Sequence, residues 1–375
     1  MEKTVSTNQA GLILCIFTIA IKLSALPALM FSYSGNDCYI ACFISLVVDF
    51  IGTIILLHYI HKHKEKTFFE LIRDSLGKTV AIIIQSILLI YFFVKCVLIL
   101  QELHDYFIAT LFEELNPIFF IIVLGLLILY CITKDFRTIG RVIQLVFWPT
   151  LVGITFTLIF PIHDLQIEKL FPIFEQGFYP IYKTIARTTF AFGDYIILLP
   201  LMGKIKFEEK SKKKLAFIMC GTLSFVFNFY IVFVGSFGKF STSQTLALGE
   251  LPLHNTTPAT IGKLEWLTIV IWTAILLLNA IILAIATKDS FDTIFHTSDK
   301  NIGTIVITLG IVTTLSLTYL QLEKVIRFLV SPTFATIIGS MHIAIILILI
   351  ISSIICSKKT NCRSSVTKNR RVKKC

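Results

Sequence analysis

The chain has 375 residues, of which 55% are hydrophobic and 15% charged, and its mean hydropathy is +0.83. These values exclude an ordinary soluble domain and indicate an integral membrane protein. The formal net charge is +11. Basic runs such as residues 204–214 (KIKFEEKSKKK) contain at most one aromatic residue, so they fit contact with anionic lipid better than nucleic-acid binding.

Apolar runs long enough to cross a bilayer recur along the whole chain. They predict an all-α membrane protein with about ten transmembrane helices, at residues 9–31, 38–60, 79–102, 118–133, 141–161, 185–203, 215–235, 264–286, 303–321 and 328–356. Residues 1–8 form a short polar N-terminus and residues 357–375 a basic tail, which we expect to be disordered.

Lysine and arginine are distributed unevenly between alternate loops. The loops on the side of both termini hold 25 of these residues and the opposite loops hold 7. Because positive residues are retained on the cytoplasmic side, both termini are predicted to be cytoplasmic.

The first predicted span contains a lysine and a serine in residues 21–27, which read IKLSALP. A charge at the bilayer centre costs about 2.5–3.5 kcal/mol on insertion scales, so it persists mainly where another group compensates it. Pro27 has no backbone N–H and tends to break a helix at that depth. We therefore predict a broken first helix with Lys22 at the break.

The sixth predicted span contains a similar interruption, Gly193 followed by Asp194, with Pro200 six residues after the aspartate. Glycine loosens a helix and a buried aspartate needs a partner. Spans one and six each open a set of five, so the halves at residues 9–161 and 185–356 are predicted to be an inverted repeat, joined by an outer interfacial segment at residues 162–184. Interrupted helices at matching positions of inverted halves indicate a midplane substrate site.

A broken helix exposes backbone N–H groups at one half-helix end and C=O groups at the other, which suits a zwitterionic amino acid. The residues predicted to bind substrate are Lys22, Ser24, Ala25, Gly193, Asp194 and Tyr195. Lys22 and Asp194 are also candidate proton-coupling groups, and Lys95 is a candidate for coupling or for lining the cavity. Phe190 and Phe192 are candidate gates. A fixed structural ion pair between Lys22 and Asp194 is the alternative.

Other features are weaker. The polar loop at residues 240–262 could be a lid or a connector, and Asn228, Asn279 and His342 are interpreted as hydrogen-bonding residues between helices. The nine cysteines show no zinc-type spacing, and there is no P-loop, GxSxG or HExxH motif. We expect no enzyme activity, no metal and no cofactor.

Several short motifs together resemble those of the spore-germination permeases of the GerAB type. They are LSALP at residues 23–27, SGND at 34–37, LFPIFEQGFYP at 170–180, FGD at 192–194, and LEW at 264–266 with Trp272. This family resembles a branch of the amino acid-polyamine-organocation transporters, with a five-plus-five inverted repeat. The chain departs from it in two places: Lys22 stands where many members have a glycine-rich break, and Asp194 stands where many have glutamate.

The resemblance implies the permease-like B subunit of a nutrient-germinant receptor, located in the spore inner membrane beside an A-type subunit and a lipoprotein C-type subunit. It implies a small-molecule germinant, for which an amino acid is the expected class. A proton-coupled amino-acid symporter and a ligand-free membrane scaffold for receptor subunits are the alternatives.

Overall fold

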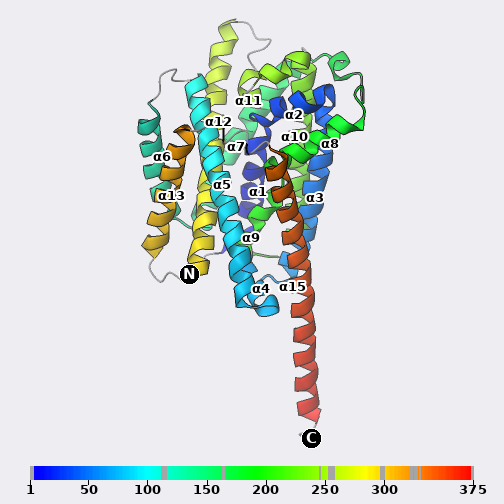
Figure 1. Ribbon diagram of the computed structural model, residues 1–375, viewed down its shortest axis with the longest axis vertical. Coiled ribbons are helices and arrows are strands. Elements are labelled where there is room, and N and C mark those ends of the chain that lie inside the picture. Colours follow the sequence, from blue (N-terminus) through cyan, green and yellow to red (C-terminus); the bar gives the residue numbers. More distant parts are fainter. Residues whose placement is uncertain are drawn as a thin grey trace.

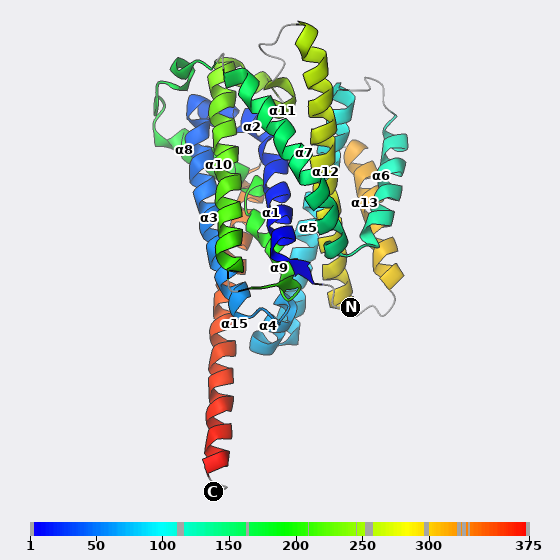
Figure 2. The ribbon, with the colours of Figure 1, turned by 180° about the vertical axis from the view of Figure 1, so that it is seen from behind.

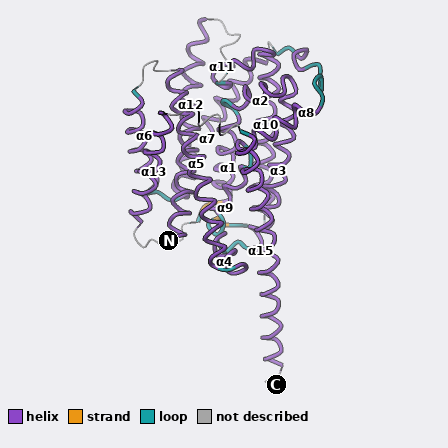
Figure 3. Tube along the Cα trace, viewed as in Figure 1, coloured by secondary structure: helices purple, strands orange, loops and turns teal. Residues whose placement is uncertain are grey.

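The computed structural model describes residues 4–110, 116–162, 165–208, 210–244, 246–251, 258–295, 300–320, 324, 328 and 331–372. Within these ranges the chain is almost entirely helical, with one short pair of strands (Figure 3). The helices are α1 (Thr7–Lys22), α2 (Leu26–Ser34), α3 (Cys38–Lys62), α4 (Phe68–Leu76), α5 (Lys78–Thr110), α6 (Pro117–Ile132), α7 (Phe136–Ile162), α8 (Phe178–Thr188), α9 (Leu198–Leu201), α10 (Ser211–Phe237), α11 (Ala247–Glu250), α12 (Pro258–Phe295), α13 (Lys300–Leu320) and α15 (Pro332–Val372).

Six stretches of the described residues are long and apolar enough to cross a membrane: Leu26–Lys62, Lys78–Thr110, Phe136–Ile159, Ser211–Ser243, Trp266–Phe295 and Pro332–Cys356. Three shorter apolar helices accompany them, at Thr7–Lys22, Ile118–Ile132 and Asn301–Leu317. A set of long apolar helices with apolar residues on their exposed surfaces defines an all-α integral membrane protein. The predicted membrane class is therefore confirmed, while the count of ten spans and the inverted relation of the halves stay predictions.

Local sequence sets the starts of several helices. Ser6 accepts a hydrogen bond from the backbone N–H of Gln9, whose side chain in turn accepts from the Ser6 N–H. Thr67 and Glu70 form the same reciprocal capping box at the start of α4. Such caps satisfy N–H groups that have no partner inside the first helical turn.

Both predicted helix breaks are present. Residues 23–25 form a turn between α1 and α2, and Pro27 lies in the first turn of α2, where its missing N–H costs nothing. The second break begins where α8 ends at Thr188 and continues through two 3-10 turns, η3 (Thr189–Ala191) and η4 (Asp194–Ile197). Between them Gly193 adopts a left-handed backbone conformation with φ of +82°, which a residue with a Cβ adopts only with strain.

The broken helices lie in the middle of the bundle. In Figures 1 and 2, α1 and α9 run between one edge formed by α6 and α13 and an opposite edge formed by α3 and α8. α3 packs along α10, and α5 packs along α12. Both breaks are therefore enclosed by long helices.

A parallel strand pair joins the bases of the two broken helices. β1 (Val5–Ser6) pairs with β2 (Ile205–Lys206), with Val5 opposite Ile205. The side chain of Thr7 continues this contact through its hydroxyl, which lies 2.7 Å from the Ser211 hydroxyl. The strand pair and the C-terminal end of α15 lie toward the same end of the bundle (Figure 3), as expected if both termini are on one side of the membrane.

Several helix boundaries differ from the predicted spans, and three differences change the predicted organisation of the chain. α8 begins at Phe178, so part of the predicted interfacial segment at residues 162–184 belongs to the first half of the sixth helix. Beyond the break that helix retains only the single turn α9. The predicted disordered tail is wrong for residues 357–372, because α15 continues to Val372 through a stretch without glycine or proline.

Candidate functional site

An ion pair joins the two helix breaks. Lys22 is the last residue of α1 and Asp194 is the first residue of η4, and the Lys22 ammonium donates a hydrogen bond to Oδ2 of Asp194. Both side chains are almost completely buried. The pairing that the sequence predicted between these two residues is therefore present, and it connects segments 172 residues apart.

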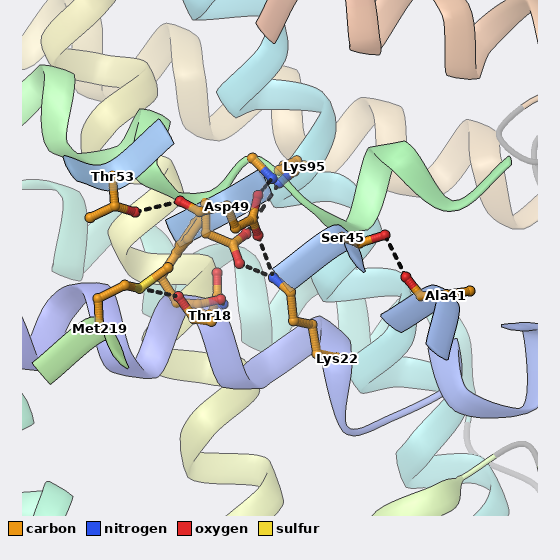
Figure 4. Close-up of polar contacts among 12 residues, drawn as sticks. Thr18, Lys22, Ala41, Ser45, Asp49, Thr53, Lys95 and Met219 are labelled. Atoms are coloured by element: carbon orange, nitrogen blue, oxygen red, sulfur yellow. Dashed lines mark hydrogen bonds and ion pairs between the residues drawn. The ribbon is translucent and has the colours of Figure 1, made fainter. Parts of the chain in front are cut away.

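Two further charges complete the site. Oδ2 of Asp49, on α3, lies 3.4 Å from the Lys22 ammonium, and the Lys95 ammonium, on α5, lies 3.7 Å from Oδ1 of Asp194 (Figure 4). We call Lys22, Asp49, Lys95 and Asp194 the charge cluster. Its formal charges cancel, which compensates the cost of burying each of them in an apolar surrounding.

Asp49 also holds the second break in place. Its Oδ1 accepts a hydrogen bond of 2.7 Å from the backbone N–H of Gly193. Asp49 is fixed on α3 one turn before Thr53, whose hydroxyl donates to the Asp49 carbonyl at 2.8 Å (Figure 4). One carboxylate thus satisfies a backbone donor at the break and contributes a charge to the cluster.

Aromatic rings cover the ammonium groups. The Lys22 ammonium lies 4.8 Å from the centroid of the Phe192 ring, and the Lys95 ammonium lies 5.0 Å from that of Tyr91 and 5.4 Å from that of Phe17. These distances are within the range of cation–π attraction. Phe192, a predicted gate, is buried against Lys22, whereas the second predicted gate, Phe190, is only partly buried.

The first break is closed by the loop between α10 and α12. The backbone N–H groups of Ala247 and Leu248, in α11, donate to the carbonyl groups of Ser24 and Leu23 at 3.3 and 3.1 Å. A broken helix is expected to leave such carbonyl groups available to a ligand, but here they accept hydrogen bonds from α11. The described part of the loop at residues 240–262 covers the break instead of merely connecting two helices.

The remaining residues that were predicted to bind substrate differ in their burial. Ser24 is buried and Ala25 is exposed, and the Glu102 carboxylate on α5 lies beside the Ser24 hydroxyl and the Ala25 N–H. Tyr195 is buried, and its ring packs directly on the Cα of Gly52 in α3. Ala25 is thus the one exposed residue among the six that were predicted to bind substrate.

The sequence reasoning missed Asp49. The signal was available, because Asp49 is the only charged residue in residues 38–60, and the cost of an intramembrane charge applies to it as it does to Lys22. The prediction of site residues depended on charges next to helix breaks, and α3 contains no break. Among the polar residues predicted to bond between helices, Asn279 donates to the Phe17 carbonyl at 3.2 Å, whereas Asn228 bonds within its own helix.

The described residues contain no group of three or more His, Cys, Asp or Glu side chains that could hold a metal ion. A buried and balanced set of charges at two helix breaks, inside a bundle of membrane-spanning helices, is typical of a permease-like membrane protein.

Comparison with known proteins gives the same class. The solved structure of Mhp1, a nucleobase-cation-symport-1 family transporter in a closed conformation with bromovinylhydantoin bound, matches 94% of this chain and 91% of its own with a TM-score of 0.54. At 14% sequence identity this match concerns the fold alone. The chain therefore has a transporter fold.

The sequence model of the family described as "Spore germination protein" matches residues 4–325, and the chain belongs to this family. Spore germination protein YndE of Bacillus subtilis (strain 168) is 24% identical over 233 residues, which cover 61% of this chain and 62% of YndE. The matched stretch is thus about three fifths of that relative's length. The family resemblance stated from the sequence is confirmed.

Proposed function

We propose that the protein is the permease-like subunit of a spore nutrient-germinant receptor and that it binds a small germinant, of the amino-acid class, beside the charge cluster. The observation that carries this proposal is the meeting of both helix breaks at a buried and neutral set of two lysines and two aspartates. Buried charges inside a membrane protein are costly, and they are found mainly where they act on a substrate, an ion or a proton. Family membership supports the germination role.

The amino-acid class follows from the chemistry of the site. A zwitterion carries one carboxylate and one ammonium, and the cluster offers both lysine donors and aspartate acceptors within one small volume. A neutral zwitterion entering this region leaves its total charge unchanged. A ligand with a net charge would add an uncompensated charge in a low-dielectric surrounding.

In this proposal Lys22, Asp194, Gly193 and Tyr195 form the wall of the site at the second break, and Ser24 and Ala25 contribute from the first. Phe192 covers the Lys22 ammonium, and Phe190 stands at the partly exposed side. Opening the site requires α11 to release the carbonyl groups of the first break, since it now satisfies them.

The proposed location is the spore inner membrane with both termini in the cytoplasm. The proposed partners are an A-type receptor subunit and a lipoprotein C-type subunit. The asymmetry of lysine and arginine between alternate loops supports this orientation.

A proton-coupled amino-acid symporter is the second candidate. It is favoured by the transporter fold shared with Mhp1 and by the presence of two buried carboxylates that could accept protons. In that case the role of the protein is amino-acid transport and not the sensing of a germinant.

The test is binding and uptake of the twenty L-amino acids by the purified chain reconstituted in liposomes, with and without a pH gradient. Saturable binding without uptake supports the sensor, and uptake that follows the pH gradient supports the symporter. Lys22→Ala is expected to abolish either activity. If no amino acid binds, or if Lys22→Ala leaves both binding and the germination response intact, the protein is better described as a scaffold with a structural charge cluster.

A further inference from the structure

Three buried polar atoms around the second break have no hydrogen-bond partner among the described residues. They are the Tyr91 hydroxyl, the Lys95 ammonium and Nε2 of His342. We call Tyr91, Lys95 and His342 the polar triad. Buried polar groups in folded proteins are nearly always hydrogen-bonded, so three unsatisfied ones at a single place indicate a missing partner.

The members of the triad are neighbours. The rings of Tyr91 and His342 are 5.8 Å apart between centroids and nearly perpendicular. The Lys95 ammonium lies over the Tyr91 ring, 5.0 Å from its centroid. Tyr91 and Lys95 lie one turn apart on α5, and His342 reaches the same place from α15. The three side chains therefore converge from two helices.

The triad faces the second break. The His342 imidazole packs so closely on Gly193 that a Cβ at this position would overlap it. The Lys95 ammonium lies 3.7 Å from Asp194. The triad is thus on the α5 and α15 side of the break, whereas Lys22 approaches the break from α1.

The two lysines of the charge cluster are satisfied to very different extents. Lys22 donates a hydrogen bond to Asp194 and also lies 3.4 Å from Asp49. Lys95 has an ion pair at 3.7 Å, which is too long for a hydrogen bond. Apart from this ion pair, its three N–H donors meet only the faces of two aromatic rings in the part of the chain that the structure describes. Lys95 is therefore the lysine of the cluster whose N–H donors have no hydrogen-bond acceptor among the described residues.

We propose that the polar triad binds the carboxylate of the germinant, with Lys95 as its charged anchor, while the Lys22–Asp194 pair stays intact as part of the wall. An ammonium and a phenol hydroxyl supply donors for a carboxylate, and a neutral imidazole can supply a further one. Oδ2 of Asp49, which also lacks a hydrogen bond among the described residues, is the acceptor that this proposal assigns to the germinant's ammonium. The ligand class is a small zwitterion that needs a free carboxylate. This inference rests on the proposed function and names the residues that bind the germinant's carboxylate.

The experiment compares acids with their amides. The purified full-length chain in detergent is screened by thermal shift against the twenty L-amino acids, and each one that binds is compared with its primary amide and its decarboxylated amine. The wild type is expected to bind the acid at least about tenfold more tightly than the amide, because a hydrogen bond to a charged group is worth that much or more. Lys95→Met is expected to bring this ratio close to one.

Milder variants keep the test valid if Lys95→Met does not fold. Tyr91→Phe removes one oxygen atom and is expected to weaken binding of the acid by about tenfold, because it removes one hydrogen bond to a charged group. Tyr230→Phe is the matched control, because Tyr230 lies on α10 and also has a buried hydroxyl without a hydrogen bond among the described residues. Tyr230→Phe should leave the affinity unchanged.

A second probe separates the inference from the proposed function. Sodium acetate, compared with sodium chloride at equal ionic strength, should raise the melting temperature of the wild type and not that of Lys95→Met. If no amino acid binds but this acetate effect depends on Lys95, the proposed germinant class fails and the carboxylate site stands. Equal binding of acid and amide by the wild type, or an unchanged acid preference in Lys95→Met, overturns the inference.

Discussion

The backbone N–H of Gly193 donates to Oδ1 of Asp49 at 2.7 Å. A carboxylate on the unbroken helix α3 therefore satisfies a backbone donor at the break of the sixth predicted span. The Oδ2 atom of the same carboxylate lies 3.4 Å from the Lys22 ammonium. Asp49 therefore has two separable roles, one as acceptor for a backbone group and one as a negative charge.

Substitutions of Asp49 separate these roles. Asp49→Asn retains an oxygen acceptor for the Gly193 N–H and removes only the charge, whereas Asp49→Ala removes both. Because a buried donor left unsatisfied costs about 1–3 kcal/mol, we expect Asp49→Ala to be less stable than Asp49→Asn by about this amount. Chemical unfolding of the purified variants in detergent measures the difference, and equal stabilities would show that the hydrogen bond to Gly193 contributes little.

The sequence predicted the Lys22–Asp194 pair because each residue is a charge inside an apolar span followed by a proline. The sequence also indicated Lys95, as a charge inside an apolar span without a nearby proline, but its position beside Asp194 was not predicted. Which spans face one another depends on helix packing over distances of more than a hundred residues, and no local pattern in the chain specifies it. His342 was interpreted as a residue that bonds between helices, yet its Nε2 has no hydrogen-bond partner among the described residues.

The sequence also did not predict that α11 would form hydrogen bonds with the first break. Periodicity and proline predict where a helix is interrupted, but they do not show which segment satisfies the freed backbone groups. Here the partners of Leu23 and Ser24 come from α11, more than two hundred residues later. The polar loop at residues 240–262 was predicted to be either a lid or a connector, and nothing in its sequence identified the carbonyl groups that it covers.

Gly193 is expected to tolerate no side chain while His342 is present. Gly193→Ala introduces a strained left-handed residue, at a cost of about 1–2 kcal/mol, and a Cβ that overlaps the imidazole. The double variant Gly193→Ala with His342→Ala removes the overlap and retains the backbone strain. Thermal unfolding of both single variants and the double variant should therefore give a favourable coupling energy, and strictly additive losses would contradict the packing of His342 on Gly193.

Exchanging the charges of Lys22 and Asp194 is expected to fail as a rescue. In the variant Lys22→Asp with Asp194→Lys, the new aspartate faces Asp49 and the new lysine faces Lys95, so each meets a like charge. Each single substitution should destabilise the fold by about 3–5 kcal/mol, the usual cost of breaking a buried pair, and the exchange should not recover it.

Only the exchange of all four charges of the cluster restores every opposite-charge neighbour. Folding yield and melting temperature in detergent are the measurements for the single, double and fourfold variants. Recovery by the double exchange alone would show that Asp49 and Lys95 contribute little to the cluster.

An ion pair outside the membrane-spanning helices gives a pH dependence of known sign. The Lys66 ammonium donates to Asp74 at 2.7 Å and lies 3.6 Å from the Cys356 sulfur of α15, so it connects the end of α4 to that helix. This hydrogen bond from Lys66 holds the pKa of Asp74 below its ordinary value. A carboxylate with a lowered pKa in the folded state contributes stability above its unfolded pKa of about 3.9 and loses it as the pH falls through the lowered value. The difference in melting temperature between the wild type and Lys66→Gln should accordingly be present at pH 6 and shrink below about pH 4.

Lys64→Gln is the matched control, since Lys64 is exposed and has no ion pair among the described residues. A difference that persists unchanged at low pH would mean that Lys66 acts through packing against α15 and not through its charge.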